Sequence, residues 1–90
     1  MNIADIQKFL DNKTSPGNEY IKTSFRKREA VYGLFVKGHR DYGDLKTKNF
    51  WRIVPQNQFD AYHKSEDIGL AKIFNGFDFT KLTLSKDHLN

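Results

Sequence analysis

The sequence predicts a small single domain of the α+β class. One N-terminal helix is expected to precede a three-stranded antiparallel meander, one or two further helices and a closing strand. Three observations predict this fold. Apolar residues recur at helical spacing near the start of the chain, three strand-like segments follow in close succession, and 90 residues suffice for one hydrophobic core but not for two. We therefore treat residues 1–90 as one domain.

The first element is a helix over residues 2–11. Ile3, Ile6 and Leu10 recur at the spacing that places side chains on one helix face. Asn2 is suited to cap the N-terminus, because its side-chain oxygen can accept a free backbone N–H. Residues 12–18 contain a Pro-Gly pair and are predicted to form a loop.

Three strands are predicted next, over residues 20–25, 30–37 and 49–54. The segment 30–37 is almost continuously apolar, which is typical of a central strand buried on both faces. In the third strand, Trp51 and Ile53 share a face, and we expect Trp51 in the core. Residues 38–48 are polar and are predicted to form a loop. A sheet of this size needs an apolar face covered, so the helices are expected to pack on one of its faces.

The last third of the chain is less regular. Pro55 suits the first turn of a helix, which we expect over residues 55–64. The segment 68–76 has an apolar helical face, but its Asn75-Gly76 pair is also typical of a hairpin, and we favour the helix. Residues 77–84 are predicted to form the closing strand, followed by a frayed tail at 87–90.

Positive charge is concentrated in the middle of the chain. Nine of the fifteen Lys and Arg residues lie within residues 20–52, against three acids, so this segment carries a net charge of +6 while the whole chain carries +4. A segregated basic region predicts a surface that meets phosphates or an acidic partner. The candidate nucleic-acid-binding residues are Arg26, Lys27, Arg28, Lys37, His39, Arg40, Tyr42, Lys46 and Lys48.

Two parts of this region carry most of the chemistry. Residues 26–28 form the densest basic cluster, and residues 38–48 combine an imidazole, a guanidinium, a phenol, carboxylates and amines. We expect residues 26–28 and 37–48 to form one electropositive surface. Tyr42 lies outside any apolar pattern, so we expect its ring to be exposed, where it could stack on a base.

Other classes of function find little support in the sequence. There are no cysteines, which excludes cysteine-based metal or redox sites and favours a reducing compartment, the cytosol. The three His residues are not spaced as metal ligands, and no glycine pattern suits a nucleotide, so no metal or cofactor is expected. The longest apolar stretch is seven residues, far too short to span a membrane, and no catalytic residue is assigned.

Three hypotheses of function follow. The first is a non-enzymatic module that binds nucleic acid, or is associated with it, through the basic middle segment. The second is an interaction module whose basic patch meets an acidic protein. The third is a small ribonuclease, in which His39, Arg40 and Lys46 would supply a base and cations.

Overall fold

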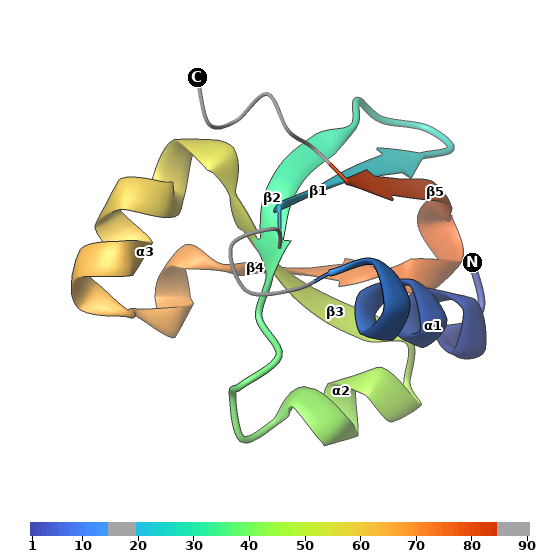
Figure 1. The fold of residues 1–90 in the computed structure, drawn as a ribbon, viewed down its shortest axis with the longest axis horizontal. Helices are drawn as coiled ribbons and strands as arrows, with labels where there is room; N and C mark the ends of the chain where they lie inside the picture. The colour runs from blue at the N-terminus through green and yellow to red at the C-terminus, as the bar shows by residue number, and fades with distance from the viewer. Residues whose placement is uncertain (15–19, 85–90) are drawn as a thin grey trace.

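Five antiparallel strands form one sheet in the computed structural model, which describes residues 1–14 and 20–84 (Figure 1). The strands are β1 (Tyr20–Phe25), β2 (Val31–Phe35), β3 (Phe50–Pro55), β4 (Lys72–Asn75) and β5 (Phe79–Leu84). Their order across the sheet is β4-β3-β2-β1-β5. The predicted α+β class is confirmed, and so is the antiparallel meander, which β1, β2 and β3 form.

Three α-helices and three short 3-10 helices surround the sheet. The α-helices are α1 (Ile3–Lys13), α2 (Tyr42–Thr47) and α3 (Phe59–Ser65), and the 3-10 helices are η1 (Gln56–Gln58), η2 (Ile68–Leu70) and η3 (Gly76–Asp78). The predicted cap of α1 is confirmed, because the Asn2 side chain accepts a hydrogen bond from the Asp5 N–H at 2.8 Å.

The sheet is strongly curved. The strands β1 and β4 have two other strands between them, yet the rings of Phe25 and Phe74 lie only 5.5 Å apart. The two edge strands β4 and β5 are joined by η3 alone, and the Arg26 N–H donates to the backbone oxygen of Asp78 beside this connection. The end of β1 and the edge strand β4 therefore face each other across one end of the sheet.

The hydrophobic core fills the inner face of this curved sheet. Its largest member is Trp51, whose predicted burial is confirmed by an exposed fraction of 1%. Ile6 and Leu10 of α1 pack into the same cluster and cover the inner face. Each such side chain contributes about 1.5–3 kcal/mol by leaving water, so α1 is an integral part of the core.

The outer face has a helix of its own. The ring of Phe59 in α3 lies 4.5 Å from that of Tyr20, which alternates along β1 with the inward Ile21. Val54, which pairs with Leu34 on the neighbouring strand, is fully buried. The prediction that the helices share one face is therefore wrong, because β3 has buried apolar residues on both faces, Ile53 on one and Val54 on the other, and both faces need cover.

Three further predictions need correction. Strand β2 is not buried on both faces, since its residues alternate and Tyr32 is 40% exposed. The predicted loop 38–48 contains α2, which the packing of Tyr42 against Trp51 stabilises. The segment 68–76 is neither the favoured helix nor a hairpin: it contains η2 and β4, because Phe74 enters the core opposite Trp51 and β4 pairs with β3.

The remaining predictions agree with the structure to within a few residues. Strand β1 has its predicted bounds, while β3 and β5 are shifted by one or two residues. The predicted helix 55–64 is divided, with Pro55 ending β3, η1 following, and α3 beginning at Phe59. Most of the predicted loop 12–18 and the tail 87–90 lie outside the described residues.

Asn49 joins several of these elements between α2 and β3. Its side-chain oxygen accepts the indole N–H of Trp51 at 2.7 Å, and its amide nitrogen donates to the Met1 carbonyl oxygen at 2.9 Å. Its backbone oxygen accepts the Gly76 N–H at 2.7 Å. Asn49 is fully buried with φ at 61°, in the left-handed region that Asn tolerates better than most residues.

We predict that Asn49→Ala destabilises the protein by about 3 kcal/mol. The change leaves the buried Trp51 N–H without its acceptor, at about 1–3 kcal/mol, and places Ala, which tolerates the left-handed region less well than Asn, at a φ of 61°, at about 1 kcal/mol. Asn49→Gly loses the same side-chain hydrogen bonds without that strain, so it should be the less destabilised of the two. Urea unfolding followed by Trp51 fluorescence measures both variants, and equal stabilities of the Asn49→Ala variant and the wild-type protein would contradict the prediction.

Candidate functional site

The nine candidate residues lie in two groups at opposite ends of β2 (Figure 1). The first, which we call the turn cluster, consists of Arg26, Lys27 and Arg28 in the turn that precedes β2. The second, which we call the helix cluster, lies in and around α2 and consists of Lys37, His39, Arg40, Tyr42, Lys46 and Lys48. Five residues of strand extend about 17 Å, so the two groups lie about that far apart, and the single electropositive surface stays a prediction.

The turn cluster is exposed and partly held by aromatic rings. The guanidinium carbon of Arg28 lies 5.2 Å from the ring centre of Phe25 and 5.3 Å from that of Phe74. A guanidinium stacks on aromatic rings through its flat face, which leaves the N–H groups at its edge available to an anion. Arg28 is therefore fixed in position by the curvature that brings β4 beside the end of β1.

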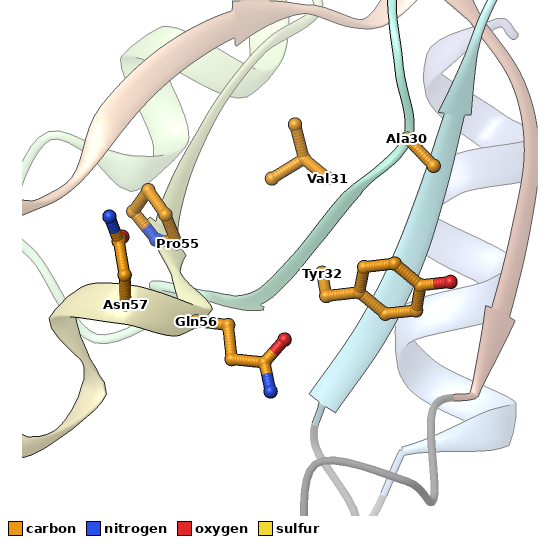
Figure 2. A pocket seen from close by; sticks show the side chains of 6 residues that line it. All are labelled: Ala30, Val31, Tyr32, Pro55, Gln56 and Asn57. Atoms are coloured by element: carbon orange, nitrogen blue, oxygen red, sulfur yellow. The ribbon is translucent and has the colours of Figure 1, made fainter.

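Three hollows adjoin one another, and the turn cluster lines the first two of them. The first, of about 410 Å³, is lined by all three cations together with Phe25, Phe74, the half-exposed Ile73, Asn75 and Asp78. The second, of about 290 Å³, shares Arg28 and Phe74 with the first and adds Lys72 from β4. The third, of about 550 Å³, shares Val31, Pro55 and Asn57 with the second and adds Tyr32, Gln56 and Ala30 (Figure 2). We call this continuous surface the groove.

The groove is positively charged, and its cations form no ion pair with another described residue. Among residues 1–14 and 20–84 the only ion pairs are those of Asp41, at the other end of β2. No described carboxylate is therefore within ion-pair distance of the turn cluster or Lys72. Among the residues that line the three hollows, Asp78 is the only one with a carboxylate, and it lines the first hollow alone. Its backbone oxygen accepts a hydrogen bond from the Arg26 N–H.

The helix cluster contains a charge network centred on Asp41. Arg52 donates to both carboxylate oxygens, and the Nδ1 of His39 lies 2.6 Å from one of them. The hydrogen bonds from Arg52, followed by that from His39, outweigh partial burial and lower the pKa of Asp41 from 3.8 to about 2. An ionised carboxylate only accepts hydrogen bonds, so the His39 Nδ1 carries the hydrogen.

Tyr42 does not have the predicted exposure. It is half-buried, its ring lies 6.0 Å from that of Trp51, and its hydroxyl donates to the side-chain oxygen of Gln7 in α1 at 3.0 Å. Burial raises the pKa of Tyr42 above its ordinary value. The amine of Lys46 lies 5.6 Å from the same ring, and the packing of that ring against Trp51 leaves less of it accessible to a base than the predicted exposure implied.

The other members of the helix cluster are dispersed. The amine of Lys37 donates to the Thr14 hydroxyl at 3.2 Å, while Arg40 and Lys48 are exposed. His39 lines none of the three hollows. Asp41 orients its imidazole as acid–base chemistry requires, but no substrate-sized hollow of the groove adjoins it.

Two other kinds of site are not found among the described residues. Within residues 1–14 and 20–84, no three His, Asp or Glu side chains are grouped so that they could hold a metal ion. The same residues include no helix with the length and apolar character needed to cross a bilayer.

Sequence reasoning missed several residues of the groove. Lys72 and Ile73 come from a segment that we expected to be a helix, and Gln56 and Asn57 from the expected start of another. Tyr32 was assigned to a strand buried on both faces. The alternation of Val31, Tyr32 and Gly33 was the available signal for its exposure, whereas nothing local indicates that Phe74 lies beside Arg28.

The Asp41 network leads to a prediction on acid stability. The folded pKa of about 2 lies below the ordinary value of 3.8, so the network stabilises the protein fully above pH about 4, and this contribution is lost as the pH falls toward 2. Asp41→Asn should therefore flatten the pH dependence of the melting temperature between pH 4 and 2. Asp44→Asn, which removes an exposed carboxylate of α2 without an ion pair among the described residues, is the matched control. Equal pH profiles for the two variants would contradict the prediction.

Comparison with known proteins identifies no relative of this chain. The chain matches no protein-family model, no curated protein and no solved structure. Its function is therefore inferred from its own side chains. The groove offers the most specific arrangement of them: aromatic rings, amides, and cations that pair with no carboxylate of the described residues, all on one surface.

Proposed function

We propose that this protein is a non-enzymatic module that binds nucleic acid in the groove. The observation that carries the proposal is the guanidinium of Arg28, which lies over the rings of Phe25 and Phe74 beside Arg26 and Lys27. No carboxylate of the described residues pairs with these cations. A fixed guanidinium with a free N–H edge is well suited to bind a phosphate through two hydrogen bonds.

The extent of the groove favours a polymer over a single phosphate. Its cations come from the turn before β2 and from β4, and the groove continues beyond them to uncharged amides and Tyr32. Hollows of roughly 300–1,000 Å³ are typical of ligand sites, but these three adjoin each other along one surface. Repeated phosphates along a strand match such a row of cations, and the absence of cysteines suits a reducing compartment such as the cytosol.

An acidic protein partner is the second candidate. It is favoured by Ile73, which is 50% exposed on β4 next to the turn cluster. Strand β4 is at the end of the strand order, so one edge of it is unpaired within the sheet. An extended acidic peptide could pair with this edge while its carboxylates meet Arg26 and Arg28.

The proposal predicts binding that weakens steeply with salt. Each phosphate contact releases condensed counterions, and four contacts from Arg26, Lys27, Arg28 and Lys72 give a log–log slope of about −3 on single strands. Replacing Arg26, Lys27 and Arg28 together by Gln should flatten this slope by about two units and weaken binding to all sequences alike. Fluorescence anisotropy titrations of labelled DNA and RNA at several salt concentrations measure both effects.

The helix cluster provides a control of equal charge. Replacing Lys37, Arg40 and Lys48 together by Gln also removes three exposed cations, but at the other end of β2. We expect this triple variant to bind almost as the wild-type protein does. Equal losses for the two triple variants would contradict a localised site, and binding of an acidic peptide but of no nucleic acid would favour the second candidate.

The same samples test the ribonuclease hypothesis. A non-enzymatic module leaves the labelled RNA at full length after prolonged incubation, as seen on a denaturing gel. Cleavage that disappears in His39→Ala would instead assign the activity to the helix cluster, where Asp41 orients that imidazole.

A further inference from the structure

We infer that the groove takes single-stranded nucleic acid, with one base stacked on the ring of Tyr32 while phosphates lie against the turn cluster. This inference rests on the proposed function and names its ligand class. It comes from the uncharged end of the groove, which the phosphate contacts leave unused. There the hollow of about 550 Å³ is bordered by Tyr32 and by the amides of η1 (Figure 2).

Tyr32 has the exposure and the surroundings of a stacking platform. It is 40% exposed, on the outer face of β2. Strands β1 and β3 flank β2 on opposite sides. The ammonium group of Lys22 on β1 lies 5.7 Å from the ring centre, whereas the hollow extends toward Pro55 at the end of β3. The ring therefore borders open space on the β3 side and has a cation on the β1 side, where a phosphate of the same strand can be bound.

The side chains on the opposite wall of this hollow can form hydrogen bonds with the edge of a base. Figure 2 shows the side chains of Gln56 and Asn57 across the hollow from Ala30 and Tyr32. Both amides are exposed, and neither makes a side-chain hydrogen bond to any other described residue. A carboxamide offers a donor and an acceptor side by side, which is the pattern that the edges of unpaired bases match.

The two ends of the groove are close enough for one short strand. Arg28 and Tyr32 are four residues apart, and a fully extended chain of that length reaches at most about 14 Å. Arg28 and Val31 also line the same intermediate hollow. A strand with a phosphate on Arg28 therefore places a base only a few nucleotides away on Tyr32.

Duplex nucleic acid cannot use this end of the groove. In a duplex the base faces are stacked on each other and the base edges are paired, so a surface aromatic ring has no base to stack on. A duplex would meet the cations alone. Single strands should therefore bind more tightly than duplexes of the same length, even though their lower charge density makes phosphate contacts individually weaker.

The experiment compares a labelled single strand of about 12 nucleotides with its duplex, a length within the site sizes of small single-strand-binding folds. Tyr32→Leu should weaken single-strand affinity by about 5- to 100-fold, which corresponds to the loss of one base–aromatic stack. Its duplex affinity and its salt slope should stay unchanged. Tyr32→Phe keeps the ring and should bind as the wild-type protein does. Phe77→Leu is the matched control, since Phe77 is a more exposed ring that lines none of the three hollows.

A second measurement follows the stacked base directly by fluorescence. A strand carrying the fluorescent base 2-aminopurine should be quenched on binding the wild-type protein when that base reaches Tyr32, and Tyr32→Leu should abolish the quenching. Single-strand binding that Tyr32→Leu leaves intact, or a duplex bound as tightly as the single strand, would overturn this inference while the proposed function stands. If neither form binds at low salt, both the inference and the proposed function fail.

Discussion

The side chain of Asn49 holds together segments that are distant in the sequence. It accepts the indole N–H of Trp51 inside the core and donates to the carbonyl of Met1, while its backbone oxygen receives the N–H of Gly76. These contacts connect β3, the residues before α1 and the start of η3. This arrangement requires a glycine at position 76, since a methyl group there would overlap the Asn49 side chain and Ile6. One buried residue thus satisfies, with its side-chain amide and its backbone oxygen, polar groups of three segments where they meet the core.

The groove depends on the same connection. The hydrogen bond from Gly76 to Asn49 holds η3, the connection between β4 and β5, in place. Strand β4 pairs with β3, whereas β5 pairs with β1, so the chain returns here from one edge of the sheet to the other. The sheet must curve to allow this return, and the curvature brings Phe74 beneath Arg28. The rings of Phe25 and Phe74, on β1 and β4, are then held in place by the fold, and Arg28 of the adjoining turn lies over them. A binding surface built in this way loses little conformational freedom when a ligand arrives.

Local patterns predicted those elements whose stability is mostly local. The spacing of Ile3, Ile6 and Leu10 and the cap at Asn2 sufficed for α1, and alternation sufficed for β1 and β3. Elements that depend on distant partners were missed: α2 needs Trp51 beneath Tyr42, and β4 needs β3 beside it. The candidate site shows the same division. Charge density identified Arg26, Lys27 and Arg28, but the contribution of Lys72, Tyr32 and Gln56 follows only from strand order and curvature.

The strand order also determines when the molecule can fold. Strands β1 to β4 pair with neighbours along the chain, but the second partner of β1 is β5, and Ile21 pairs with Leu84, which lies 63 positions later in the sequence. Closing so long a loop is slow, and during synthesis β5 leaves the ribosome after all the other strands. Until then, one edge of β1 exposes its hydrogen-bonding groups to any other chain nearby. The nascent protein is therefore most prone to aggregate just before its last strand arrives, and the exposed Lys81 of β5 discourages further strand addition once that edge is closed.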